Sequence, residues 1–123
     1  MAKLKATPKN FEQALRFILD FKSKLSIRIG NNTYLEYHTG YGTGYTESIT
    51  VRLHTTNIVT FWPSGRTTLC TGGHRTVTTK ERINHFISGR VYQKAHQWYY
   101  VRNRGELGID WDKPVEFTEG IEV

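Results

Sequence analysis

One alternating stretch decides the fold: Ser48-Ile49-Thr50-Val51-Arg52-Leu53-His54. Ile49, Val51 and Leu53 project to one side of an extended chain, because successive side chains of a β-strand point to opposite faces. The residues between them are polar or charged. The pattern therefore predicts a half-buried strand, and the flanking sequence must supply neighbouring strands and a cover for the apolar face.

The cover is predicted upstream of this strand. Thr7-Pro8 is typical of a helix start, and apolar residues then recur at the three-and-four spacing of one helical face. They are Phe11, Ala14, Leu15, Ile18, Phe21 and Leu25. We expect an amphipathic helix from about Pro8 to Lys24 that packs on a sheet.

Further strands are predicted on both sides, separated by turn-forming residues such as Gly30-Asn31-Asn32, Pro63-Ser64-Gly65 and Ala95-His96. A glycine-rich loop is expected from Thr39 to Thr46. The additional strands are Ser26 to Ile29, Thr33 to Tyr37, Asn57 to Trp62, Arg66 to Thr71, Arg90 to Lys94 and Gln97 to Arg102, with Val115 and Phe117 as a short edge strand.

A short second helix is expected before the last hairpin. Thr78 and Glu81 have the spacing of a capping box, and the helix would run to about Ile87 with Arg82 and His85 on its exposed side. The predicted class is α+β: an N-terminal amphipathic helix on an antiparallel sheet of about six strands, and a short second helix before a C-terminal hairpin. Residues 1–104 would form a single domain, and residues 105–123 an acidic C-terminal tail.

Composition excludes several functional classes. No apolar run approaches the roughly 20 residues of a membrane span, and the N-terminus lacks the pattern of a secretion signal. Cys70 is the only cysteine among 123 residues, so an internal disulfide is impossible and a zinc ribbon is disfavoured. The five histidines show no zinc spacing. We expect an intracellular protein without a cofactor or metal.

Charge is unevenly distributed along the chain. Residues 66–104 carry eight basic residues against Glu81 alone, whereas residues 105–123 carry six acidic residues against Lys113. A basic segment that also holds aromatic residues is typical of nucleic-acid binding. The acidic tail is interpreted in three ways: as a solvated end, as a partner-binding peptide, or as an internal mimic of DNA that covers the basic surface.

A longer motif carries a resemblance. The stretch Thr71-Gly72-Gly73-His74-Arg75-Thr76-Val77-Thr78-Thr79-Lys80-Glu81-Arg82-Ile83-Asn84 is similar to a family of small tailed-bacteriophage proteins. Asn31-Asn32-Thr33-Tyr34-Leu35 and Phe117-Thr118-Glu119-Gly120-Ile121 also resemble that family, so the similarity covers roughly residues 31–121. It implies a phage origin. A weaker resemblance is to the single-stranded-DNA-binding cofactors with which some phages recruit their own RNA polymerase.

The basic segment is the candidate binding site. Phosphate contacts are expected from Arg66, Arg75, Lys80, Arg82, Lys94, Arg102 and Arg104, and base stacking from Tyr92, Trp98 and Tyr100. Alternation along Gln97 to Arg102 requires that either the Trp98/Tyr100 set or the Tyr99/Val101 set packs inward. The competing interpretation is that the rings lie in the core and the charges form an ordinary solvated surface.

The loop from Arg75 to Lys80 is the sharpest local candidate. Gly72-Gly73 permits a close backbone approach, and the free amides at the start of the next helix could hold a phosphate with help from Arg75, Thr78, Thr79 and Lys80. The simpler interpretation is a well-capped helix.

These patterns predict a sequence-tolerant protein that binds single-stranded DNA, or RNA, in phage transcription or replication. Its candidate partners are a phage RNA polymerase and a second copy of the chain, and it would act in the cytoplasm of the infected bacterial host, away from membranes. The alternative is a host-takeover or anti-defence protein that inhibits a bacterial partner through a protein interface. A nuclease using His54 or His85 with Glu47 or Glu81 is a third hypothesis, and we expect no enzyme.

Overall fold

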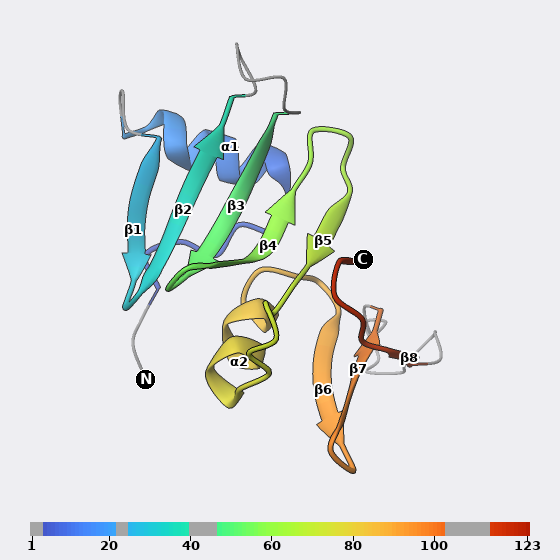
Figure 1. Ribbon diagram of the computed structural model, residues 1–123. Helices are drawn as coiled ribbons and strands as arrows, with labels where there is room; N and C mark the ends of the chain where they lie inside the picture. The colour runs from blue at the N-terminus through green and yellow to red at the C-terminus, as the bar shows by residue number, and fades with distance from the viewer. Residues whose placement is uncertain (1–3, 22–24, 40–46, 103–113) are drawn as a thin grey trace.

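The computed structural model describes residues 4–21, 25–39, 47–102 and 114–123, and the α+β class is confirmed (Figure 1). The two helices are α1 (Phe11–Leu19) and α2 (Val77–Asn84). The strands are β1 (Ser26–Gly30), β2 (Thr33–His38), β3 (Ser48–Leu53), β4 (Thr56–Phe61), β5 (Thr67–Leu69), β6 (Arg90–Lys94), β7 (Gln97–Val101), β8 (Val115–Glu116) and β9 (Ile121–Glu122).

Some expectations concern residues outside these ranges. They are the end of the first helix at Lys24, most of the loop from Thr39 to Thr46, the side chain of Arg104, and residues 105–113 of the acidic tail.

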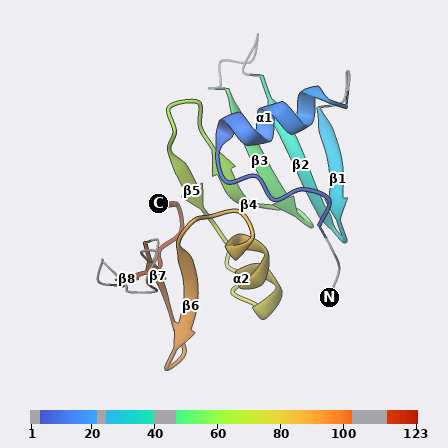
Figure 2. The ribbon, with the colours of Figure 1, turned by 180° about the vertical axis from the view of Figure 1, so that it is seen from behind.

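The larger sheet is antiparallel, with strand order β1-β2-β3-β4-β5-β9. Its strand registers align one buried apolar row across five strands: Ile27, Leu35, Val51, Val59 and Leu69. Helix α1 lies across this face, behind the sheet in Figure 1 and in front of it in Figure 2. The alternation of β3 thus buries the predicted residues, Ile49, Val51 and Leu53, under the predicted helix.

A second, three-stranded antiparallel sheet has the order β6-β7-β8. The final hairpin is confirmed, but it does not join the large sheet. Its place there is taken by β9, which pairs with β5 through Leu69 and Ile121. Residues 115–123 therefore add a strand to each sheet, and Phe117 between these strands is fully buried.

Both helices begin at a residue other than the expected one. Asn10 caps α1 by accepting a hydrogen bond from the Gln13 backbone N–H at 2.8 Å. Thr76 caps α2 by accepting from the Thr79 backbone N–H at 3.1 Å. The Thr78–Glu81 capping box is wrong because Thr76 provides an equivalent hydroxyl one half-turn earlier.

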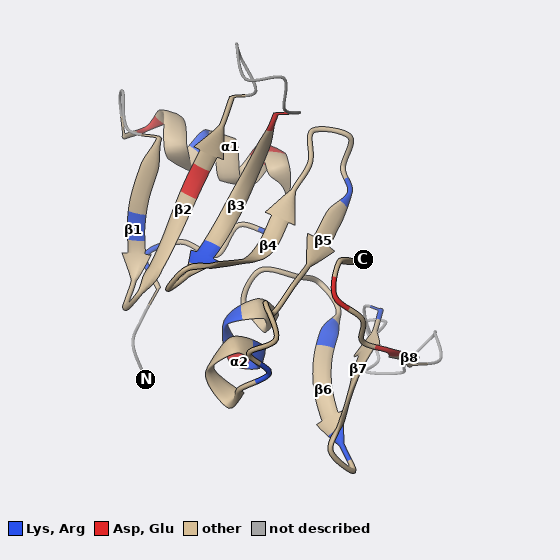
Figure 3. Ribbon diagram, viewed as in Figure 1, with Lys and Arg blue, Asp and Glu red and all other residues tan. Residues whose placement is uncertain are grey.

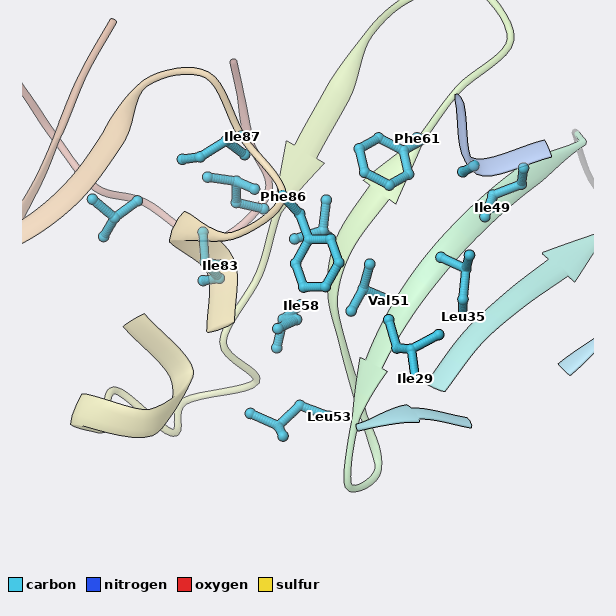
Figure 4. Packing of buried hydrophobic residues seen from close by; sticks show 14 of the residues in the cluster. Ile29, Leu35, Ile49, Val51, Leu53, Ile58, Phe61, Ile83, Phe86 and Ile87 are labelled. Carbon is cyan, nitrogen blue, oxygen red and sulfur yellow. The ribbon is translucent and has the colours of Figure 1, made fainter. Parts of the chain in front are cut away.

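One apolar cluster joins both helices and every strand except the short β8. Figure 4 shows Ile83, Phe86 and Ile87, from α2 and the residues after it, approaching Ile58 of β4 and the core face of the large sheet. Burial of each such side chain contributes roughly 1.5–3 kcal/mol. The two sheets and the helices therefore form a single core.

A side-chain amide fastens α2 to the outer strand of the smaller sheet. The Asn84 Nδ2 group donates to the Val91 carbonyl at 2.9 Å, and the Val91 N–H donates to Asn84 Oδ1 at 2.8 Å. Asn84 thus pairs with Val91 much as a neighbouring strand would. The contact fixes the position of β6 relative to α2.

Candidate functional site

The β6–β7 hairpin has one buried face and one open face. Register pairs Val91 with Tyr100 and Tyr92 with Tyr99, so the two pairs lie on opposite faces. Val91, Trp98 and Tyr100 are buried, whereas Tyr92 and Tyr99 are only half-buried. Trp98 and Tyr100 therefore pack inward. Val101, from the other set, is also buried at the end of β7, so the outward rings are those of Tyr92 and Tyr99.

The outward rings form a stacked pair. The ring centroids of Tyr92 and Tyr99 are 5.7 Å apart and their planes are 27° from parallel. The Arg90 guanidinium carbon lies 5.8 Å from the Tyr92 centroid, and exposed Lys94 ends the same strand. We call Arg90, Tyr92, Lys94 and Tyr99 the hairpin face.

One acidic residue borders the hairpin face. Glu116 of β8 is opposite Tyr99 in the register, and its carboxylate accepts a hydrogen bond from Gln97 at 3.1 Å. The described residues of these three strands thus include two cationic side chains and one carboxylate. The surface is aromatic and modestly positive.

Two of the expected stacking residues are unsuitable. Trp98 is 2% exposed and Tyr100 is 7% exposed, so neither ring offers a free face to a base. Trp98 packs edge-on against Phe117 at 5.6 Å, and the charged ends of Arg75 and Lys80 each lie 5.9 Å from its centroid. We therefore correct the expectation that these two rings stack on bases, because both side chains lie on the face of β7 that is directed into the core.

Arg82 also departs from its expected place. It is 6% exposed, and its Nε atom has no hydrogen-bond partner in the structure. With so little exposed surface, Arg82 is poorly placed to contact a phosphate in solution. The expected place of Arg82 on the exposed side of α2 is therefore wrong, because Arg82 lies one helical turn from buried Thr79 and shares that buried side.

The remaining cations do not gather on one surface. Figure 3 shows Lys and Arg on α2, on β6, at the tip of the β6–β7 hairpin and beside β5. Arg66 lies over Trp62, at 5.7 Å from the ring centroid, and 3.7 Å from the Glu122 carboxylate. Arg102 is exposed and follows β7. The basic run in the sequence is therefore divided among separate regions of the fold.

The loop before α2 does not assemble the expected phosphate cradle. The Thr76 and Thr79 hydroxyls lie 3.1 Å apart and complete the cap, while Arg75 and Lys80 turn toward Trp98. These contacts favour the simpler interpretation of a capped helix.

A carboxylate from the C-terminal segment holds this loop in place. Glu119 accepts hydrogen bonds from the Thr71 backbone N–H, at 2.6 Å, and from the Thr71 hydroxyl, and lies 3.7 Å from Arg75. Burial on its own would raise the pKa of the Glu119 carboxyl, but the Thr71 hydrogen bonds and the Arg75 charge outweigh burial and lower the pKa. Burial and the adjacent Glu119 carboxylate raise the pKa of the Cys70 thiol.

The variant Glu119→Gln should therefore lose stability in a pH-dependent way. Because folding depresses the pKa of this carboxyl, its stabilisation is present above the ordinary value of 4.5 and is lost as the pH falls. We expect a loss of about 1 kcal/mol at neutral pH and convergence with the wild type in acid. Urea unfolding across a pH series measures this difference, and a constant difference at every pH would contradict the assignment.

Three further expectations concern metal binding, membrane crossing and a nuclease. No group of three or more His, Cys, Asp or Glu residues there could hold a metal ion. Among the same residues, no helix is long and apolar enough to cross a membrane. Of the residues named for a nuclease, Glu47 is hydrogen-bonded to Tyr37, and His54 lies at the other end of β3.

The comparison with known families identifies the chain's relatives. The model of the Kyanoviridae Gp96 protein family matches residues 9–123. The chain belongs to this family. No curated protein and no solved structure matches it.

The Gp96 match confirms the bacteriophage resemblance and extends it to nearly the whole chain. The match gives no information about the resemblance to phage RNA polymerase cofactors, so that resemblance remains a hypothesis. On the hairpin face, Arg90 and Tyr99 accompany the expected Tyr92 and Lys94, although the sequence pattern did not single them out as contact residues. The alternation that separates Tyr92 and Tyr99 from Trp98 and Tyr100 was visible in the sequence, but the choice between the faces was not.

Proposed function

We propose that the chain binds single-stranded nucleic acid, DNA or RNA, through the hairpin face. The stacked Tyr92–Tyr99 pair between Arg90 and Lys94 carries the proposal. Aromatic faces stack on unpaired bases of any sequence, and adjacent cations attract the phosphates. The proposed role is binding without catalysis, in phage transcription or replication in the host cytoplasm, with a phage RNA polymerase as candidate partner.

The length of the hairpin limits the contact. Arg90 and Lys94 stand at opposite ends of a five-residue strand, which spans roughly 13 Å at about 3.3 Å per residue. That distance accommodates a short run of nucleotides over the two rings. Few phosphates are then neutralised, and stacking supplies much of the affinity.

We therefore expect a shallow dependence of binding on salt. A titration of a labelled single-stranded oligonucleotide should give a slope of log K against log salt of about −1.4 to −2.8, corresponding to roughly two to four phosphates. Arg90→Ala/Lys94→Ala should make this slope shallower by about 1.4. Lys5→Ala/Arg28→Ala removes equal charge from the exposed residues near β1 and should leave it unchanged.

The nature of the ligand provides a second control. Duplex DNA of the same sequence and an abasic strand of the same length retain the phosphates but deny the rings an unpaired base. Both should bind more weakly than the single strand. Equal affinity for all three would contradict a stacking site, and no binding at low salt would refute the function.

A protein-binding role has one observation in its favour. Leu19, Phe21 and Leu25, around the end of α1, are 65%, 39% and 52% exposed. Exposed apolar residues are found at many protein interfaces. A host-takeover protein would be recognised by recovery of one bacterial protein with wild-type chain but not with a Leu19→Ser/Leu25→Ser variant, and by no shift of the labelled oligonucleotide.

A further inference from the structure

A cavity of about 490 Å³ lies between the turn that joins β3 to β4 and the loop that leads into α2. This volume falls within the range of small-molecule sites, roughly 300–1,000 Å³. One side of the cavity is lined by residues 53–56 and by Ile58. The other side is lined by residues between Thr71 and Thr79. It belongs to different elements from the hairpin face.

The lining is composed of hydroxyl, imidazole and aliphatic side chains. Its ten residues include six threonines, two histidines, Leu53 and Ile58, and no Lys, Arg, Asp or Glu. Leu53 and Ile58 are buried and supply an apolar floor. A ligand would therefore be held by apolar contact and hydrogen bonds instead of ion pairs.

Several polar groups of the lining are available to a ligand. The hydroxyls of Thr76 and Thr79 contact each other, and that of Thr71 donates to Glu119. Thr55, Thr56 and Thr78 make no side-chain hydrogen bond to another described residue. Together with the exposed imidazoles of His54 and His74, they offer both donors and acceptors.

The backbone at His54 adds an independent observation. His54 occupies the left-handed region, with φ 55°, in the two-residue turn closed by the Leu53–Thr56 pair. Glycine adopts this conformation without the steric cost that a histidine incurs. Its backbone N–H donates to the Asn32 carbonyl at 2.8 Å, which fixes the turn from which His54 lines the cavity.

We propose that this cavity binds an uncharged, planar nitrogen heterocycle of nucleobase size. The flat faces of such a ring match the apolar floor of Leu53 and Ile58. Its polar edge matches the hydroxyls and imidazoles. The inference does not depend on the hairpin face, because a free nucleoside would be sufficient as ligand.

The test is a titration of the full chain with adenosine, guanosine, cytidine and uridine, followed by NMR of the His54 and His74 ring signals. Glucose and inorganic phosphate are the comparison probes. At least one nucleoside should shift both histidines in a saturable way, and neither comparison probe should do so. Binding of glucose or phosphate at this site, or of no nucleoside, would overturn the proposal.

Two variants localise the site without threatening the fold. His54→Gly removes the imidazole and suits the left-handed backbone, so stability should be unchanged or raised while nucleoside affinity falls at least about fivefold. Thr78→Val, at an exposed position, should also weaken binding. Unchanged affinity in both variants would overturn the site, as would loss of binding in Tyr92→Leu/Tyr99→Leu.

Discussion

The double variant Tyr92→Leu/Tyr99→Leu should bind a single-stranded oligonucleotide about 100-fold more weakly than the wild type, because each lost stacking contact is worth roughly 1–3 kcal/mol. Leucine keeps an apolar side chain on the hairpin, so the fold should be retained. Fluorescence anisotropy of a labelled strand at low salt measures the affinity.

A matched control exists on the larger sheet. Tyr34 of β2 is also half-buried and also carries a guanidinium over its ring, that of Arg52 at 4.4 Å. Tyr34→Leu should leave oligonucleotide affinity unchanged. If Tyr34→Leu weakened binding and the hairpin double variant did not, the nucleic acid would lie on the open face of the larger sheet and the hairpin site would be wrong.

The variant Trp98→Ala should lower the free energy of unfolding by about 3–5 kcal/mol, as large-to-small changes of buried aromatic residues do. Trp98 connects β7 to Phe117 of the C-terminal segment, and its removal leaves a cavity under Arg75 and Lys80. The free energy of unfolding of a small domain is roughly 5–15 kcal/mol in total, so this variant would lose much of its stability. Urea unfolding followed by circular dichroism gives the value.

The neighbouring Tyr99→Ala is the comparison. It removes a half-buried ring from the outward face, so its cost should be about 1 kcal/mol, near that of a surface cross-strand pair. A similar loss of stability in both variants would contradict the assignment of the faces. Weaker oligonucleotide binding by a fully folded Trp98→Ala would restore Trp98 as a contact residue.

The difference between local and long-range information explains which parts of the fold were predictable. Alternation located β3 and its buried face, and three-and-four spacing located α1, because these signals lie within a few residues. The two-residue strand β9 has no such pattern. It is defined by its pairing with β5, more than fifty residues earlier, and pairing at that distance leaves no local signal.

The candidate site was predictable only in part for a similar reason. Alternation separated two sets of side chains on β7, but each contained a ring, and contacts with distant residues, such as that of Trp98 with Phe117, distinguish them. Arg66 and Lys94 belong to one basic run in the sequence, yet antiparallel turns place them in separate regions. Charge counted along a chain therefore measures composition, and the topology determines whether it forms a surface.

The Asn84–Val91 contact also bears on self-association. Strand β6 is an outer strand of its sheet, and such edges are templates on which a second molecule can add a strand. Here the peptide groups of Val91 are already occupied, so an incoming chain would have to displace two hydrogen bonds before it could pair at that point. The amide of one asparagine thus protects this border against edge-to-edge aggregation.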